Sequence, residues 1–426
     1  YRVNVMSIKL YLKKGAIYLY MFARWLVLSG LVGVICGLVG SLFRLSLDYA
    51  HHTFDSHHDL IYMLPVAGLF IVWIYRKLRM NHKDTNTILE SLRSYDKIPI
   101  MMAPLIFIST FITHIYGGSS GKEGAALQMG GAIGSFIGRK LKLNKNEVKV
   151  LIMCGMSSLF STFFLAPLTS SVFSIEVINV GTMYYGALLP CLFSSIVSIA
   201  IAKLFGLTTI SFPGISVPEL SFMNVGKVLV LAIVGALISV IFCMCMHYFH
   251  KGVKKIIPNP YFRVLCGGII IMLLTILIGN YRYNGAGMDI ISEALNGHAL
   301  NIDFICKIIF TVITLGVGFK GGEILPSFFI GATYGNVFSN VLGLDNSFGA
   351  SLGLITLFSA VVNCPITSII LSCEFFGAEG IIYYGLASIV GYMLSGYTSL
   401  YDSQKIIYSK LGMDKNKEKV NSEIEN

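Results

Sequence analysis

Apolar runs of about 20 residues, the length that crosses a lipid bilayer as an α-helix, recur along this chain. Of its 426 residues, 55% are hydrophobic and 13% are charged, whereas soluble domains carry roughly a quarter charged residues. We therefore predict an all-α polytopic membrane protein and exclude a soluble enzyme or binding domain. The expected spans lie near residues 22–47, 59–79, 98–116, 150–165, 182–205, 226–249, 261–279, 303–318, 348–362 and 379–397.

The chain is basic, with a formal net charge of +10. A basic chain can bind nucleic acid, but here Lys and Arg gather in short loops and near the ends, without interleaved aromatic residues. Such loops follow the positive-inside bias of membrane proteins, so we expect contact with membrane lipid and not with nucleic acid. The same bias predicts a multi-pass membrane protein with both termini in the cytoplasm.

The nine cysteines nearly all lie inside the apolar runs, where a free Cys behaves as a small hydrophobic residue. No His has a spacing to them that suits a metal ion, so we expect neither disulfides, a metal site nor a cofactor. The chain begins at Tyr1 and no cleavable signal pattern precedes the first apolar run. The apolar segments are therefore expected to be permanent structure.

Four further apolar pieces, at residues 121–137, 167–180, 325–341 and 365–376, are too short or too rich in Gly and Pro to cross a bilayer alone. In lipid, such pieces are stable only where protein or a water-filled cavity covers their free backbone groups. Broken helices of this kind indicate a transport site.

The chain contains an internal repeat. Residues 155–176 and 353–374 are identical at nine of 22 positions without a gap, and the segments that begin at Gly121 and Gly322 align at nearly the same offset. The second alignment places Glu123 opposite Ile324. We predict one transmembrane domain over residues 1–401, with repeats at about 30–205 and 226–401, followed by a short polar cytoplasmic tail at 402–426.

Transporters built from two repeats often relate them by a pseudo-two-fold axis in the plane of the bilayer, with the substrate near mid-membrane where broken helices meet. The N-terminal ends of such helices carry partial positive charge and unpaired N–H groups. Paired helix ends from two repeats therefore form an anion site without a full positive charge. The implied substrate is an anion.

Glu123 stands among glycines at the expected start of a short helix. An ionised carboxylate there could occupy the anion position and leave it when protonated, as a tethered competitor of the anion. The alternative is a glutamate that caps a helix on a surface loop. We prefer the first interpretation because acidic residues at membrane depth are rare and usually functional.

Glu323 opens the equivalent helix of the second repeat, with Pro326 in its first turn. It could relay protons to Glu123 or pair with Lys320. Glu176 and Glu374 occupy matching places in the two repeats, and this symmetry favours a shared structural role such as capping. His114 and Met129 are expected to be core residues.

Three segments carry a resemblance to a known family. "GKEGAALQMG" is similar to the G-[K/R]-E-G-P signature of the CLC family of chloride channels and anion/proton antiporters, and "GGEILP" is similar to its G-x-F-x-P signature. "APLTSSVFSIE" resembles a third segment of that family. The resemblance runs from about Gly30 to Tyr401. It implies an inverted-repeat homodimer with one pore per subunit.

The resemblance also implies roles for individual residues. Glu123 stands where the family has its external gating glutamate, Ile324 where a Phe lines the anion site, and Tyr401 where a pore tyrosine binds the anion. The resemblance further implies an anion-binding set made of Gly121, Lys122, Gly124, Ala125, Thr85, Asn86, Thr87, Ile324, Leu325 and Tyr401.

Several positions depart from the family pattern. Ala125 replaces the signature proline, the early loop lacks the signature serine, and Glu176 is followed by Val177 where chloride antiporters carry a second glutamate. These departures resemble the bacterial fluoride-exporting branch, which has an Asn in the early loop, as Asn86 here, and a glutamate at the position of Glu323.

Asp84 is a discrepancy, because an ionised carboxylate at the cytoplasmic mouth repels anions. It could be protonated, turned away or paired with Lys83.

Together these features predict a CLC-type transporter that exchanges a halide, fluoride more than chloride, for protons that enter through Glu123. A chloride channel or chloride/proton exchanger of the same family is the alternative. An intramembrane enzyme that uses Glu123 or His114 as an acid or base belongs to another class, and no nucleophile or metal set accompanies either residue. We therefore do not expect an enzyme.

Overall fold

The computed structural model describes residues 2–80, 84–208, 212, 214–410 and 420–421, and it describes side chains from Lys14 onward. The described chain is almost entirely helical. In the first half, the elements are α1 (Arg2–Ser56), the 3-10 helix η1 (His58–Met63), α2 (Leu64–Lys77), α3 (Thr85–Ser94), α4 (Met102–Ile115), α5 (Glu123–Lys140), α6 (Lys145–Phe164), α7 (Pro167–Glu176), β1 (Asn179–Val180), η2 (Tyr185–Ala187) and α8 (Leu188–Leu204).

The second half contains α9 (Phe222–Ile256), α10 (Pro260–Ile278), α11 (Met288–Leu295), α12 (Asp303–Val317), α13 (Ile324–Leu342), α14 (Asn346–Val362), α15 (Pro365–Phe376), α16 (Ile381–Leu394) and β2 (Lys405–Ile406). Within the described residues, six helical segments are long and apolar enough to cross a membrane. The prediction of an all-α polytopic membrane protein is confirmed. The six segments are Lys14–Ser56, His58–Lys77, Lys145–Phe164, Tyr185–Leu204, Phe222–Ile256 and Pro260–Ile278.

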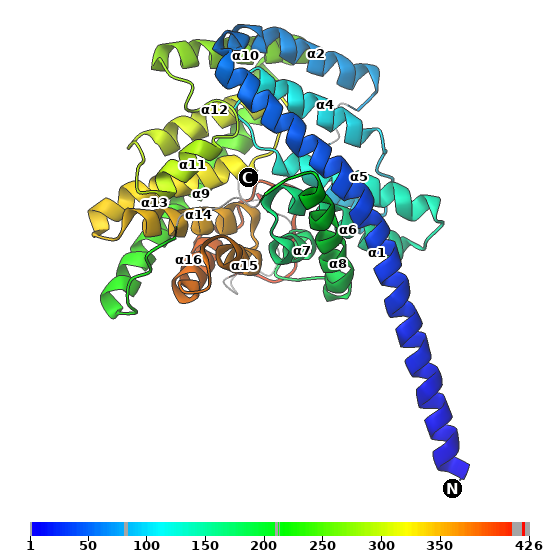
Figure 1. The fold of residues 1–426 in the computed structure, drawn as a ribbon. Helices are drawn as coiled ribbons and strands as arrows, with labels where there is room; N and C mark the ends of the chain where they lie inside the picture. Colours follow the sequence, from blue (N-terminus) through cyan, green and yellow to red (C-terminus); the bar gives the residue numbers. More distant parts are fainter. Residues whose placement is uncertain (1, 81–83, 209–211, 213, 411–419, 422–426) are drawn as a thin grey trace.

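The two repeats have matching elements, since α5 to α8 in the first correspond to α13 to α16 in the second. Figure 1 shows these two groups on opposite sides of the molecule, with α7 and α15 facing each other between them. In each repeat the first two of these helices pack closely, because glycines such as Gly130 and Gly155 bring their backbones together. Gly331 and Gly353 have the same role in the second repeat.

The two repeats also pair directly at the centre of the molecule. The N–H of Gly121 donates to the carbonyl oxygen of Gly322 at 2.6 Å, and the N–H of Gly322 donates to the carbonyl oxygen of Gly121 at 2.7 Å. The bridge is antiparallel and joins the residues that the alignment of the repeats matched. A reciprocal antiparallel bridge between equivalent residues is the local geometry of a two-fold axis. It therefore places the starts of α5 and α13 side by side.

A second reciprocal contact involves Glu176 and Glu374, the acidic residues that match between the repeats. The Glu176 carboxylate accepts hydrogen bonds from the N–H groups of Ile366 (3.1 Å) and Thr367 (2.8 Å), at the start of α15. Glu374 accepts from the N–H groups of Leu168 (3.0 Å) and Thr169 (2.9 Å), at the start of α7. Each glutamate thus caps the helix of the other repeat. The expected structural role of this pair is confirmed.

The chain continues past Tyr401 as a packed segment. Lys405 and Ile406 in β2 pair in parallel with Asn179 and Val180 in β1. Gln404 is fully buried, and its amide donates to the carbonyl oxygens of Val177 (2.9 Å) and Val362 (2.8 Å), which follow α7 and end α14. The packed domain therefore includes residues beyond the boundary at Tyr401 that the sequence suggested.

Candidate functional site

Glu123 is the first residue of α5, and its side chain is fully buried. Its Oε2 atom accepts a hydrogen bond from the N–H of Lys122 at 3.0 Å, and the N–H of Leu325, in the first turn of α13, lies within reach of the same carboxylate. Oε1 has no hydrogen-bond partner among the described residues. The carboxylate therefore lies where the N-terminal ends of α5 and α13 meet.

The residues around Glu123 explain why glycines are needed there. A Cβ atom at Gly121 would lie 2.7 Å from Glu123 Oε2 and 3.0 Å from the carbonyl oxygen of Gly322, so a larger residue would displace one of them. The ammonium group of Lys122 is 3.8 Å from Asp48 of α1. The charge of Lys122 is therefore partly balanced by Asp48, and the helix ends supply partial positive charge at the Glu123 carboxylate.

Glu323 immediately precedes α13, in the same position relative to its paired glycine as Lys122 has in the first repeat. Its Oε2 atom has no hydrogen-bond partner in the described part of the chain, and a Cβ atom at Gly124 would lie 3.4 Å from it. Glu323 thus faces the start of α5, while Glu123 faces the start of α13. The two carboxylates cross between the repeats.

The alternative expectation for Glu323, an ion pair with Lys320, is not found among the described residues. The ammonium group of Lys320 lies 4.7 Å from the ring centre of Tyr75 instead. Glu323 therefore keeps one carboxylate oxygen available for a proton or a mobile partner.

Tyr401 is 1% exposed, and its hydroxyl group has no hydrogen-bond partner among the described residues. This hydroxyl lies within electrostatic reach of both Glu323 and Glu123. The turn that presents it is held by Ser399, whose hydroxyl accepts a hydrogen bond from the N–H of Tyr401 at 3.1 Å. An unpaired buried hydroxyl costs free energy, which a bound anion would recover.

The early loop forms the start of α3. Asp84 caps this helix, because its Oδ1 accepts the N–H of Thr87 at 3.2 Å while the N–H of Asp84 donates to the Thr87 hydroxyl at 3.3 Å. Of the three explanations for this acidic residue, the structure therefore favours a carboxylate turned into its own helix. Lys83, the possible ion-pair partner, lies outside the described residues.

Thr85 and Asn86 are fixed from two directions. The Thr85 hydroxyl accepts a hydrogen bond from Gln128 of α5 at 2.8 Å. Asn86 Oδ1 accepts the N–H of Ser403 at 3.0 Å. Because the amide oxygen already accepts this hydrogen bond, the NH₂ group of Asn86 is the part that can donate to an anion. Among the described residues, the NH₂ group makes one long hydrogen bond of 3.5 Å, to Asp84.

A cavity of about 250 Å³ joins several of these residues. Of the predicted site residues, it is lined by Thr85, Asn86, Glu323 and Tyr401, and Asp84 lies at its wall. Glu123, Gly121, Lys122, Gly124, Ala125, Thr87, Ile324 and Leu325 do not line it. The predicted anion-binding set thus divides into residues that line the cavity and residues that do not, and among the latter Ile324 and Leu325 are fully buried at the start of α13.

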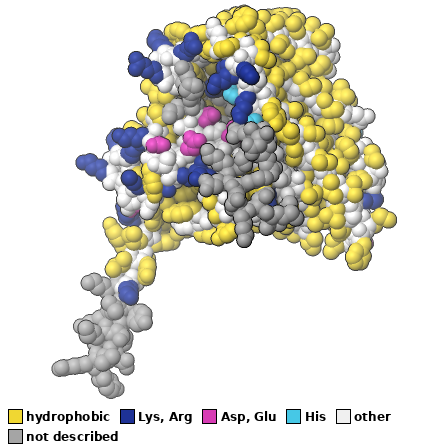
Figure 2. All heavy atoms as spheres, turned by 180° about the vertical axis from the view of Figure 1, so that it is seen from behind, with side chains coloured by type: hydrophobic (Ala, Val, Ile, Leu, Met, Phe, Trp, Pro, Cys, Tyr) yellow, Lys and Arg dark blue, Asp and Glu magenta, His cyan; other side chains and the backbone are white. Residues whose placement is uncertain are grey.

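Other cavity residues had not been predicted as part of the site. Gln128, His247, His250 and Asp402 line the cavity, together with Lys320. Figure 2 shows Asp and Glu side chains close to His, Lys and Arg side chains on one face, within a surface that is otherwise largely hydrophobic. The spacing of His247 and His250 places them on one face of α9, and polar residues on one face of an apolar helix were the signal that could have indicated them.

His114 lies in the core as expected. It is 5% exposed, and its Nδ1 is 2.9 Å from the carbonyl oxygen of Thr110 one turn earlier in α4. Away from the cavity, His51, Asp55 and Asp289 bring one possible metal-ligand atom each within 4.8 Å of one another. Both aspartates are exposed. His51 contacts Asp55 at 3.4 Å within α1, and its contact with Asp289 at 3.3 Å joins α1 to α11.

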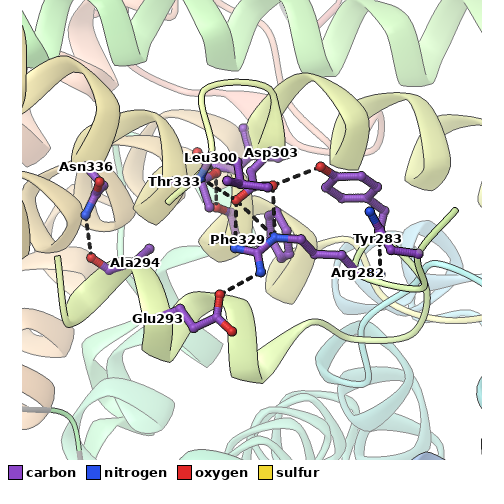
Figure 3. A network of polar contacts seen from close by, with 11 residues as sticks. Arg282, Tyr283, Glu293, Ala294, Leu300, Asp303, Phe329, Thr333 and Asn336 are labelled. Atoms are coloured by element: carbon purple, nitrogen blue, oxygen red, sulfur yellow. Dashed lines mark hydrogen bonds and ion pairs between the residues drawn. The ribbon is translucent and has the colours of Figure 1, made fainter. Parts of the chain in front are cut away.

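A polar network supports the Glu123 loop from the side of the second repeat. Figure 3 shows Asp303 of α12 receiving hydrogen bonds from Arg282, Tyr283 and the N–H of Leu300. Asn284, which follows Tyr283 in the chain, donates to the carbonyl oxygen of Gly117 at 2.8 Å. The network therefore fixes the loop that contains Tyr283 and Asn284, and this loop contacts the segment that leads to Glu123.

We expect Asp303→Asn to lower the free energy of unfolding by about 3–5 kcal/mol, because it leaves the guanidinium group of Arg282 without its buried partner. Asp303 is fully buried and bonds to this guanidinium at 3.0 Å. Thermal unfolding of the purified protein in detergent measures the loss. Glu293→Gln removes the exposed partner of the same arginine and serves as the control, with an expected loss below about 1 kcal/mol. Equal losses in the two variants would contradict this assignment.

A family model described as the voltage gated chloride channel matches residues 67–396. A chloride/fluoride channel protein of Pseudomonas syringae pv. tomato is 33% identical over 396 residues, which cover 91% of this chain and 88% of that protein. A voltage-gated ClC-type chloride channel of Escherichia coli is 23% identical over 324 residues, which cover 73% of this chain and 76% of that protein.

Two solved structures are similar in fold. The crystal structure of a CLC-type fluoride/proton antiporter has a TM-score of 0.88 and 28% identity, covering 91% of this chain and 99% of that one. A slow cyanobacterial chloride/proton antiporter has a TM-score of 0.75 at 18% identity, covering 87% of this chain and 94% of that one.

Proposed function

Since this chain belongs to the voltage-gated chloride channel (CLC) family and is an anion transporter of that type, we propose that it exports fluoride in exchange for protons. The family resemblance and the fold class predicted from the sequence are confirmed. Members of this family are transporters and channels, so nothing supports the alternative of an intramembrane enzyme.

One observation carries the proposal. Three buried oxygen atoms, Glu123 Oε1, Glu323 Oε2 and the Tyr401 hydroxyl, have no hydrogen-bond partner among the described residues. They accompany the paired N-terminal ends of α5 and α13. A buried carboxylate oxygen without a partner can take up a proton, and a buried hydroxyl group without a partner can donate to an anion, so these three atoms support a site that serves both.

The mechanism is competition for one position. The ionised carboxylate of Glu123 takes the place at the two helix ends that an anion would take. Protonation removes its charge and lets it leave, so that an anion enters from the cavity. Because one occupancy excludes the other, each proton that arrives at Glu123 is linked to the movement of an anion. Glu323, facing the start of α5, would carry protons between Glu123 and the cavity.

Fluoride requires strong hydrogen-bond donors because it gives up tightly held water when it enters a protein. Asn86 and Tyr401 line the cavity and offer an NH₂ group and a hydroxyl group, and Thr85, whose hydroxyl accepts a hydrogen bond from Gln128, lines it as well. Residue 177 is Val, so the second glutamate of chloride antiporters is missing. The 33% identical relative is named a chloride/fluoride channel protein, which also supports fluoride as the substrate.

The oligomeric state is inferred from the family resemblance, and the orientation in the membrane is inferred from the distribution of Lys and Arg among the loops. We infer a homodimer in which each subunit holds one pore. The positive-inside bias of the basic loops supports both termini on the cytoplasmic side, and the resemblance to the bacterial branch of the family supports a bacterial plasma membrane. The domain that we assign to transport comprises the repeats at about 30–205 and 226–401.

Anion efflux from proteoliposomes tests the choice of substrate. We expect fluoride efflux to be at least about ten times faster than chloride efflux. This ratio corresponds to a difference of about 1.4 kcal/mol in the activation free energy of transport. An external pH electrode should record protons entering the vesicles as fluoride leaves. Equal rates for the two halides would favour the chloride transporter, and fluoride efflux without proton movement would favour a channel.

A further inference from the structure

A second cavity, outside the transport site, is strongly basic. It measures about 280 Å³ and lies between α2, α9 and α10, close to the end of α12. Figure 1 shows α2 and α10 side by side at one edge of the molecule. Five basic side chains line it, and its lining, all from the described part of the chain, includes no Asp or Glu. They are Arg76, His250, Lys254, Arg263 and Lys320.

Three cations of this basic cavity have no acidic partner in the described part of the chain. Among the described residues, no ion pair involves Arg76, Lys254 or Arg263. Arg263 donates to the carbonyl oxygen of Val317 at 3.2 Å, which aims its guanidinium group along the cavity wall. Several uncompensated cations around one small cavity favour a ligand with several anionic oxygens, and phosphate groups have this chemistry.

An apolar groove begins on the neighbouring face of α9. It measures about 650 Å³ and follows α9 toward the same end of the helix as the basic cavity. Phe249 and Val253 in the groove each precede a residue of the basic cavity, His250 and Lys254. The groove is lined by Ile241, Met244, Cys245, Tyr248, Phe249, Gly252, Val253, Ile256 and Val312.

We propose that the groove and the basic cavity together bind an anionic phospholipid. Its acyl chain lies along α9, and its phosphate group lies between Arg76, Lys254 and Arg263. α9 is one of the segments long and apolar enough to cross a membrane, so an apolar groove along it faces hydrocarbon. Lys254 lies in its last turn, at the depth where lipid phosphates are found.

This lipid would touch a wall of the transport cavity. Tyr75, His250 and Lys320 line both cavities. Three carboxylates, Asp84, Glu323 and Asp402, line the transport cavity together with Lys320 and do not line the basic one. A phosphate group bound in the basic cavity would therefore interact with Lys320, which also faces the carboxylates of the transport cavity.

Native mass spectrometry of the delipidated full-length protein tests the site with phosphatidylglycerol as the anionic probe and phosphatidylcholine as the neutral one. We expect the wild type to retain phosphatidylglycerol in preference, and Arg76→Gln combined with Lys254→Gln to weaken that binding by about tenfold or more. The matched control combines Lys77→Gln with Lys255→Gln. These neighbours on the same helices carry the same charges outside the basic cavity, and Lys77 packs on an aromatic ring as Arg76 does.

Two results would overturn the proposal. The first is equal loss of phosphatidylglycerol in both double variants, which would indicate that surface charge alone attracts the lipid. The second is binding of inorganic phosphate that is as tight as binding of phosphatidylglycerol. This result would indicate that the basic cavity is a site for soluble phosphate and that the groove has no role. Retention of the lipid by the control, together with phosphate binding at least about tenfold weaker, supports the lipid site.

Discussion

Glu123→Gln should abolish proton transport while passive fluoride movement continues. The amide has nearly the shape of the carboxylate but carries no charge and cannot take up a proton. It therefore neither competes with an anion at the ends of α5 and α13 nor delivers protons. We expect proton flux to fall by a factor of about 100 or more, the size of effect that loss of a proton-transferring group produces. Simultaneous recording of fluoride and pH in proteoliposomes measures both fluxes.

The control for this variant is Glu379→Gln, which removes an exposed carboxylate between α15 and α16. It should leave both fluxes as in the wild type. If Glu123→Gln kept normal exchange of protons for fluoride, with the dependence on pH unchanged, Glu123 would have no part in the mechanism. The proposed competition between the Glu123 carboxylate and the anion would then be wrong.

Glu323→Gln is expected to reduce proton flux by a similar factor of about 100, and to leave fluoride flux measurable. The reason is the unpaired Oε2 atom of Glu323, which lies at the boundary between the transport cavity and the start of α5. A proton that travels from the cavity to Glu123 meets this oxygen on its way. The recording used for Glu123→Gln separates the two fluxes here as well.

Asp402→Asn is the matched control, because Asp402 is another carboxylate of the transport cavity. Asp402 already has partners, since its Oδ1 is 3.2 Å from His247 Nδ1 and accepts the amide of Asn421 at 2.6 Å. We expect proton coupling to persist in this variant. Loss of coupling in Asp402→Asn with normal coupling in Glu323→Gln would move the proton path to Asp402.

The helical membrane fold and its duplication could be predicted from the sequence. Apolar runs of sufficient length allow few structures in lipid, and the identities between residues 155–176 and 353–374 record the repeat directly. The symmetric role of Glu176 and Glu374 followed from their matching positions. The roles of Glu123 and Glu323 were inferred from their positions at helix starts among glycines, and these inferences remain proposals that the two variants test.

Other features depend on contacts between distant parts of the chain. The hydrogen bond from Ser403 to Asn86 joins residues 317 positions apart and selects which end of the amide faces the cavity. His247 and His250 belong to the site only because they line the same cavity as Glu323 and Tyr401. Their spacing indicates a polar face of α9, but no local pattern in the sequence shows which residues lie opposite that face.

The amino-acid sequence alone determined that this protein crosses a membrane as helices, that its two halves share one fold, and that helix starts rich in glycine carry acidic residues. Hydropathy and repetition are properties of the chain itself, so they can be read without coordinates. Only the tertiary structure decided that the two carboxylates cross between the repeats and that the segment after Tyr401 is packed. Both depend on which backbone N–H groups and side chains meet in space, and folding brings those groups together from distant parts of the chain.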